Sequence, residues 1–398
     1  MASPTRARAT VALFTRCSLA LIAAAFLPAL AGCAKERTPA PAAGAPATDR
    51  APSAGPGAFQ IGIMCGTVSQ GEEDYRACQQ LAARYPGRVR LVTYPDNFST
   101  ELETVISQMV GLSQDPAVKV IIDAEAIPGS VAAARRIREL RPDILIGMVN
   151  PHEDPDVVSS VCDIAAQTDE ETRGTTIIES AQKMGARHFV HYSFPRHMAM
   201  LLMARRRDVM IAECAKRGMQ FHFVTAPDPT GEQGLPGTQQ FIFEDVPREL
   251  AKYGPQTAFF TTNGGMEEPL IKAVLNAKQG YFVEQPSPGP TSGYPAALGL
   301  QIPPGKAGDM AWIASENQRV IAAHGMSGHF GAWAKSFDIT AIRAVTQLLV
   351  AAAAHQADPH DSLTVRRYFQ DECGPAFHMR RYSPSTNQWL FVMDHVVY

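Results

Sequence analysis

Polar side chains suited to holding a small molecule follow several short apolar runs in this sequence. Thr67 and Ser69 come shortly after the run 59–64, and Glu125 follows the run 118–123. If these runs are parallel strands, their carboxyl ends meet at one edge of a sheet, where ligands of such sheets bind. The candidate ligand contacts selected by this rule are Thr67, Ser69, Glu125, Asn150, His152, Ser193, Phe194, Arg196, His197, Asn263 and Gln285. Together they offer hydrogen-bond donors, acceptors and aromatic faces, which suit a small polar ligand.

Two residues near strand ends have alternative roles that the sequence leaves open. Arg196 could bind a carboxylate or phosphate of a ligand through both arms of its guanidinium, or pair with a neighbouring Asp instead. Cys65 at the end of the first apolar run could act as a nucleophile, but no base is identifiable, so a buried thiol is preferred. No spacing places two carboxylates together, so general acid–base catalysis is not indicated.

Motifs for nucleotide, metal or nucleic-acid chemistry do not fit this sequence. The motifs GxSxG and HExxH are absent. The segment 299–307 is not a phosphate loop, because it has one residue too many between its glycines and Ala307 stands where that motif has Ser or Thr. His188 and His191 lie three apart on a predicted strand, and therefore on opposite faces. The net charge is −3, and the cationic triplet 205–207 falls in a predicted helix. We therefore predict no metal, no cofactor and no nucleic-acid partner.

The first 33 residues predict a lipoprotein signal peptide. Three Arg precede an apolar run at 19–30 that is too short to span a membrane, and Leu30-Ala31-Gly32-Cys33 has the pattern of a lipobox. Cleavage before Cys33 would leave its thiol to take the lipid and, with the three Arg removed, a mature net charge of −6. A plain signal peptide with a fortuitous Cys is the alternative. The predicted location is extracytoplasmic, with the lipid on Cys33 as anchor to a bacterial membrane.

The next segment, 34–58, contains five prolines and little apolar surface beyond Ala, so we predict a semi-extended tether. Five Cys remain beyond it, at 65, 78, 162, 214 and 373. An oxidising compartment permits disulfides, but no CxxC spacing is present and the count is odd. Buried free thiols are the preferred interpretation for most of them.

From residue 59 onward, strand-length apolar runs alternate with amphipathic stretches of helical length. Strands are predicted at 59–64, 89–94, 118–123, 144–149, 162–166, 188–192, 220–224, 258–261 and 281–283. Helices are predicted at 72–85, 99–112 with Ser99 as N-cap, 129–140, 170–184, 197–217, 246–253 and 267–278. This alternation is typical of parallel sheets covered on both faces, and the number of strands favours two sheets. The predicted fold class is α/β, with two doubly wound parallel-sheet lobes and a hinge.

The lobes are expected to be discontinuous in sequence. The first lobe is predicted to comprise 59–168 and about 286–335, and the second 169–285 and about 336–357. The chain would first cross between them near 162–166, again in the Pro/Gly-rich span 285–305, and a third time at the apolar helix 338–354. Residues 358–398 carry three large aromatic side chains near their end and are predicted to be a tail packed on the lobes.

Seven short segments resemble a known family. They are GTVSQGEEDYR at 66–76, PDNF at 95–98, PHEDP at 151–155, HYSFPRHM at 191–198, RRRD at 205–208, APDPT at 226–230 and GYPAALG at 293–299. The sequence from residue 59 onward is similar to a family of bacterial lipoproteins of unassigned function, which resembles type I periplasmic solute-binding proteins. The resemblance implies a hinged, two-lobed fold and a secreted, lipid-anchored location, but no reaction and no binding residues. Asp123-Ala124-Glu125 stands where an amide-bearing loop is usual, which would make the cleft more acidic.

The expected function is a membrane-anchored solute-binding receptor that closes on a small polar molecule for a permease or sensor. One alternative is an extracytoplasmic enzyme on the same scaffold, with Cys65, His152 or His197 reactive. A second alternative is a structural or regulatory lipoprotein whose aromatic tail contacts another protein. A DNA-binding regulator would need a helix-turn-helix segment, and none is expected before residue 59.

Overall fold

The computed structural model of this chain describes residues 59–375 and 377–398. Its strands are β1 (Gln60–Cys65), β2 (Val89–Thr93), β3 (Val118–Asp123), β4 (Leu145–Val149), β5 (Ile164–Thr168), β6 (His188–Ser193), β7 (Gln220–Thr225), β8 (Thr257–Thr261), β9 (Tyr281–Phe282), β10 (Gly331–Trp333), β11 (Phe377–Arg381), β12 (Gln388–Met393) and β13 (His395–Val397). The predicted signal peptide, Cys33 and the tether lie outside the described residues. Among the residues described, no helix combines the length and the apolar character needed to cross a membrane.

The helices follow the strands in regular alternation. They are α1 (Glu72–Arg84), α2 (Leu102–Ser113), α3 (Ser130–Leu140), α4 (Pro155–Ser159), α5 (Glu170–Met184), α6 (Pro195–Met198), α7 (Leu201–Lys216), α8 (Gly234–Tyr253), α9 (Glu267–Ala277), α10 (Tyr294–Leu298), α11 (Met310–Ala323), α12 (Phe337–Ala353) and α13 (Ser362–Cys373), with short 3-10 turns at Gly264–Met266 and Pro304–Lys306. This order confirms the predicted α/β class.

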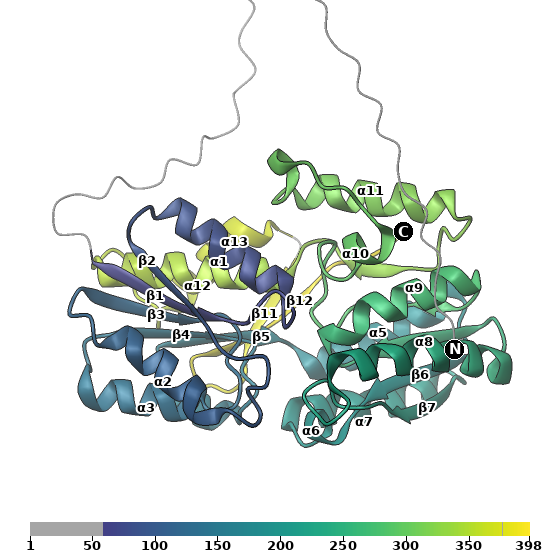
Figure 1. Cartoon of the computed structure of the whole chain (residues 1–398), viewed down its shortest axis with the longest axis horizontal. Coiled ribbons are helices and arrows are strands. Elements are labelled where there is room, and N and C mark those ends of the chain that lie inside the picture. Colours follow the sequence, from purple (N-terminus) through teal and green to yellow (C-terminus); the bar gives the residue numbers. More distant parts are fainter. Residues whose placement is uncertain (1–58, 376) are drawn as a thin grey trace, which may run out of the picture. The chain divides into compact units, whose positions relative to one another are not determined.

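The first lobe is built on a sheet in the strand order β11-β12-β5-β4-β3-β1-β2. Its pairs are parallel except that β11 runs antiparallel to β12. Helices α2 and α3 cover one face, and α1, α12 and α13 cover the other (Figure 1). Because both faces are covered, the central strands are apolar along nearly their whole length, as in β3, where five of six residues are buried.

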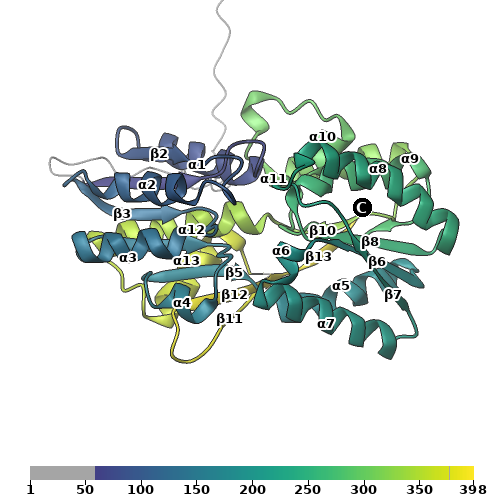
Figure 2. The same ribbon diagram turned by 60° about the horizontal axis from the view of Figure 1, so that its bottom comes forward.

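The second lobe is built on a parallel sheet in the order β7-β6-β8-β9. Helices α5 and α7 pack on one face, and α8 and α9 on the other (Figure 2). A two-stranded antiparallel ribbon of β10 and β13 continues beyond β9, to which a bridge between Phe282 and Phe330 connects it. Two doubly wound sheets are thus present, as predicted.

Two later segments belong to the opposite lobes from those predicted. Tyr294, Ile321 and Phe330 of the span 286–335 are buried in the core of the second lobe. Helix α12, assigned by the sequence to the second lobe, packs instead on β3 and β4 of the first. The contact is so close that a Cβ atom added at Gly147 would lie 2.5 Å from Val345. Helical periodicity identifies an apolar face but not which sheet it will cover, so the sequence assignment of both segments was wrong.

The C-terminal residues, predicted as a tail packed on the lobes, supply strands to both of them. Strand β12 pairs with β5 and so extends the first sheet, and β13 pairs with β10 in the second lobe. Within the described residues, the chain therefore passes between the lobes at three places: from β5 to α5, from β10 to α12, and from β12 to β13. The first two passages lie beside the predicted lobe boundaries at 168/169 and about 335/336, whereas 285–305 stays in the second lobe and contains no passage.

Three helix boundaries also differ from the predictions. Helix α2 starts after Glu101 rather than Ser99, because turns formed by the amides of Thr100 and Glu101 precede it. The helix predicted at 197–217 is divided into α6 and α7, since Met200 has an extended backbone. Helix α8 starts at Gly234 and continues through Pro247, where buried apolar side chains on one face hold it in place.

Candidate functional site

A cavity of about 330 Å³ lies where the carboxyl ends of β1, β3 and β4 face residues that follow β6 and β8. This is the position at which doubly wound sheets bind ligands. Five of the predicted contacts line it together: Ser69, Glu125, His152, Arg196 and Asn263. The strand-end rule therefore brought together residues separated by almost two hundred positions in the chain. Direct contact of these residues with a ligand stays a prediction.

The other predicted residues lie behind the lining and support it. Among the first-lobe residues, the Thr67 hydroxyl donates a hydrogen bond to Asp96, and it lies 2.7 Å from the hydroxyl of Ser69. Asn150 has a positive φ of 45° and donates from Nδ2 to Asp338 Oδ1 at 2.5 Å. Such a conformation is uncommon outside Gly but tolerated by Asn, and here it directs the amide to a cavity carboxylate.

In the second lobe, the supporting residues are buried in a chain of contacts. Ser193 Oγ lies 2.8 Å from Thr262 Oγ1, which in turn lies 3.2 Å from His197 Nδ1. Phe194 is fully buried against the His197 ring, with 4.2 Å between centroids. Gln285 is fully buried too and donates from Nε2 to the carbonyls of Gly289 and Ser292, which shapes a loop of the cavity wall.

Several lining residues were missed by the sequence rule. Glu73 and Asp74 belong to the first turn of α1, Glu267 to that of α9 and Asp338 to that of α12. In a doubly wound sheet, the helix after each strand starts at the same edge at which the strand ends. Acidic residues in first turns were visible in the sequence, but they are ordinarily explained by the helix dipole. Asp338 was missed because its helix had been assigned to the other lobe.

Arg196 takes the second of its two predicted roles. Its Nε and Nη2 bind Asp228 Oδ2 and Oδ1 at 2.8 and 2.9 Å, a bidentate ion pair. Its guanidinium also covers the rings of Phe98 and Phe194, at 5.5 and 5.1 Å from their centroids. The arginine therefore forms part of the cavity wall with its charge already balanced.

Glu125 and His152 form the other polar pair of the cavity. His152 Nε2 lies 3.3 Å from Glu125 Oε1, and the Tyr94 hydroxyl donates to Glu125 Oε2 at 3.3 Å. Burial opposes ionisation of Glu125, but the hydrogen bond and charge of His152 outweigh it and bring the pKa below its usual value. Glu125 is thus an ionised carboxylate whose two oxygens are both engaged.

The remaining buried carboxyl groups of the cavity have the opposite electrostatics. Burial, followed by the charge of Asp338, raises the pKa of Glu73 to about 8. Burial and the charge of Glu125 raise the pKa of Asp338 to about 6. The pKa values of Asp74 and Glu267 are raised well above the ordinary range, again chiefly by burial. These four groups resist ionisation because water is excluded and like charges are near.

Of the three candidate reactive groups, His152 lines the cavity, whereas Cys65 and His197 are buried behind it. Cys65 is fully buried beside Cys78, and all five described Cys are free and buried, as predicted. His197 is buried as well, which lowers its pKa well below the ordinary value, and its ring lies 6.1 Å from that of His152. Within the described residues, no group of three His, Cys, Asp or Glu is arranged to hold a metal ion.

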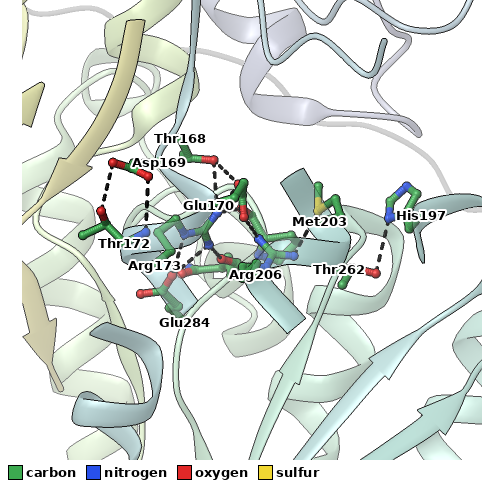
Figure 3. A network of polar contacts seen from close by, with 12 residues as sticks. Thr168, Asp169, Glu170, Thr172, Arg173, His197, Met203, Arg206, Thr262 and Glu284 are labelled. Carbon is green, nitrogen blue, oxygen red and sulfur yellow. Dashed lines mark hydrogen bonds and ion pairs between the residues drawn. The ribbon is translucent and has the colours of Figure 1, made fainter. Parts of the chain in front are cut away.

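A second buried charge cluster lies where the chain passes between the lobes (Figure 3). Arg173 Nη2 binds Glu284 Oε1 at 2.8 Å, and Arg173 Nη1 binds Glu170 Oε1 at 3.0 Å. Arg206 binds the other oxygen of Glu170. All four side chains are almost completely buried, and each charge has a partner of the opposite sign. We call these residues the connection cluster.

The connection cluster also holds the polypeptide of the connections themselves. Arg173 donates to Thr168 Oγ1 at the end of β5 and to the backbone carbonyls of Gln285 and Pro286. The indole of Trp333, which precedes the passage from β10 to α12, donates to Glu284 Oε2 at 3.2 Å. One arginine and one glutamate thus fix segments that come from distant parts of the sequence.

Comparison with known proteins identifies the family. The model of a family described as a protein of unknown function, DUF3798, matches residues 59–331, and the chain belongs to this family. An uncharacterized protein of Treponema pallidum (strain Nichols) is 36% identical over 180 residues, which cover 44% of this chain and 81% of that protein. These matches confirm the resemblance drawn from the seven segments.

Solved structures agree with the fold. A proposed transcriptional regulator from Clostridium difficile 630 superposes with a TM-score of 0.68 at 22% identity, covering 85% of this chain and 99% of that one. The substrate-binding protein of a sugar ABC transport system from Bordetella parapertussis 12822 superposes with a TM-score of 0.52 at 10% identity, covering 85% and 88%. The two-lobed fold is therefore that of type I periplasmic-binding proteins, and at these identities the likeness concerns the fold alone.

Proposed function

We propose that this member of the DUF3798 family is an extracytoplasmic solute-binding receptor, anchored by lipid on Cys33, that closes on a small polar ligand. The observation that carries the proposal is the cavity, whose lining comes from strand ends and helix starts of both lobes. Its volume lies within the usual range of small-molecule sites. A ligand that touches both lobes binds the closed form best and so shifts the population toward it.

The connections between the lobes support a hinged mechanism. Only three connecting segments join the lobes in the described residues, which allows the lobes to rotate relative to each other. In such a motion the residues of the connections change backbone conformation while each lobe moves as a rigid body. The closed shape would then be recognised by a membrane permease or sensor. No covalent step is part of this proposal: Cys65 and His197 are buried, and His152 is engaged by Glu125.

Native mass spectrometry of the full chain, purified from the membrane without refolding, tests the binding function. The expected result is a single retained small molecule at one-to-one stoichiometry. Calorimetry with that molecule should then show binding without turnover, whereas conversion to a product would establish an enzyme instead. A protein that retains nothing and binds no member of a broad solute library would overturn the proposal.

The anchor is tested separately from the cavity. The full chain expressed in a bacterial host should incorporate labelled fatty acid and sediment with membranes. Cys33→Ser should abolish both, whereas Cys17→Ser, which changes another thiol of the predicted signal peptide, should leave them unchanged. Labelling that persists in Cys33→Ser would contradict the assigned attachment site.

A further inference from the structure

The cavity contains four buried carboxyl groups that contact neutral or acidic groups rather than cations. Glu73 accepts hydrogen bonds from the hydroxyls of Thr291 and Ser336. Glu267 accepts from Ser292 and lies within hydrogen-bonding reach of the Ser287 backbone. Asp338 accepts from the amide of Asn150, and Asp74 lies within hydrogen-bonding reach of Glu125. Hydroxyl and amide donors stabilise a carboxylate only partly, because they carry no compensating charge.

Two of these carboxyl groups also have unused hydrogen-bonding capacity. Asp74 Oδ1 and Glu267 Oε1 are buried and accept no hydrogen bond, and both residues line the cavity. The exposed fractions of Asp74 and Glu267 are only 4% and 2%, so water solvates neither well. Buried acceptors without partners are uncommon in folded proteins and call for a reason such as a bound group.

The basic side chains of the cavity wall already have acidic partners. Arg196 is held by Asp228, and His152 is held by Glu125. Two further lining carboxylates, Glu72 and Glu268, are paired outside the cavity, with Arg76 and Lys272. What the wall lacks is a cation for its four innermost carboxyl groups.

We propose that the ligand of this receptor is an organic cation, and that its protonated amine groups bind Glu73, Asp74, Glu267 and Asp338. This inference rests on the solute-binding function proposed above and names its substrate class. The rings of Tyr94 and Phe98 line the same cavity and supply an apolar wall for the carbon frame of such a ligand. An ammonium group donates up to three hydrogen bonds, which matches the excess of acceptors. An organic amine also suits carboxylates that come from α1, α9 and α12 rather than from one compact metal-binding group.

Binding of a cation must be coupled to loss of protons from the site. The groups that face Glu73 and Asp338 are Glu72, Asp74, Glu125, Glu267 and, as the cation that favours ionised Asp338, Arg173. In the empty cavity the carboxyl groups hold protons into the neutral range, and an entering ammonium displaces them. Affinity should therefore rise with pH between about 6 and 8, where Asp338 and Glu73 titrate.

Titration calorimetry on the full chain in detergent tests the inference. Spermidine and putrescine are the cationic probes, with 1,4-butanediol as the neutral counterpart of putrescine, and glucosamine is compared with glucose. The amine of each pair should bind at least about tenfold more tightly than its neutral counterpart. Heats measured in two buffers of different ionisation enthalpy should show net proton release near pH 7.

Isosteric neutral variants assign the effect to the cavity. Glu73→Gln and Glu267→Gln should each weaken binding of the best amine probe by about tenfold or more, because each removes a buried countercharge. The matched control, Glu103→Gln on the exposed face of α2, should bind as the unchanged chain does. Melting temperatures of all variants verify that each is folded.

The possible failures are distinguishable. Neutral glucose or butanediol that binds as tightly as its amine would overturn the cationic ligand and leave the receptor function standing. Amine binding that Glu73→Gln and Glu267→Gln leave unchanged would overturn the assigned carboxylates. Binding of neither class, with no ligand retained in native mass spectrometry, would count against the receptor function itself.

Discussion

Two sets of buried carboxylates in this protein differ in how their charge is balanced. In the connection cluster, Glu170 and Glu284 are each bound by an arginine that is itself fully buried. In the cavity, Glu73 and Glu267 are buried almost as deeply, but they accept hydrogen bonds from hydroxyl groups rather than from cations. A buried charge that is paired maintains a structure, whereas one left unpaired is costly to the empty protein. The second arrangement is what a site for an oppositely charged ligand requires.

The largest expected effect comes from removing an arginine of the connection cluster. Arg173→Met should lower the free energy of unfolding by about 3–5 kcal/mol, because it leaves Glu284 and Glu170 buried with a countercharge removed. Urea denaturation followed by circular dichroism measures this. Arg205→Met is the control, since Arg205 is half exposed and pairs with Glu171 at the surface. Equal stability of both variants would show that the cluster does not hold the connections.

Substitution of a buried carboxyl group of the cavity should change the free energy of unfolding in the opposite direction. Glu73→Gln should stabilise the ligand-free chain by on the order of 2 kcal/mol at pH 8, because a neutral side chain avoids burying a charge. The sign follows from the raised pKa: stability due to protonated Glu73 is complete below its unfolded pKa and is lost as pH rises through about 8. Asp338 contributes a similar loss near pH 6.

Thermal melts of the ligand-free chain between pH 5 and pH 8.5 measure this dependence. The unchanged chain should lose stability toward the alkaline end, and Glu73→Gln should lose less. A melting temperature that rises over this range in the unchanged chain, or an identical slope in the variant, would contradict the assigned electrostatics. Addition of a bound cation should restore stability at pH 8, since ligands stabilise the form that binds them.

Substitutions in the polar part of the wall should have intermediate effects. Asn263→Ala, which removes a polar group of the lining, and Arg196→Ala, which uncovers the rings of Phe98 and Phe194, should each weaken binding of the retained ligand by about 1–3 kcal/mol. Calorimetry measures the change, with Gln240→Ala on the exposed face of α8 as control. If both variants bind as the unchanged chain does, the strand-end assignment of the site fails.

The smallest effect is expected at a carboxylate that lines the cavity but is already paired. Glu268 forms an ion pair with Lys272, and its side chain is 39% exposed. Glu268→Gln should therefore change both stability and amine affinity by no more than about 0.5 kcal/mol. An effect as large as that of Glu73→Gln would show that long-range charge, rather than burial without a partner, governs the site.

Much of the architecture could be predicted from local patterns. Helix α5 has the predicted bounds Glu170–Met184, and β3 spans the predicted run 118–123, because caps and apolar runs are properties of neighbouring residues. The lobe of α12 was not predictable in this way. Its apolar face could cover either sheet, and the choice depends on the space that Gly147 leaves for Val345. Pairing of β12 with β5 joins residues more than two hundred positions apart, which no local pattern encodes.

The site was predictable in part for a related reason. Strand ends such as those before Glu125 and Asn263 are visible in the sequence, so the rule found residues on both sides of the cavity. Glu73 and Asp338 required knowledge of which helix starts meet in space. Their burial is a tertiary property, and a first-turn carboxylate on the surface has the same sequence signature.

The short stretch from Trp333 to Asp338 joins the two clusters compared above. Trp333 donates to Glu284, while Ser336 donates to Glu73 and Asp338 faces the cavity. An indole so close to a point where the chain changes lobes provides an intrinsic optical reporter. Its emission, isolated by replacing Trp312 and Trp389 with Phe, should shift when the cavity fills, so occupancy could be followed without any attached dye.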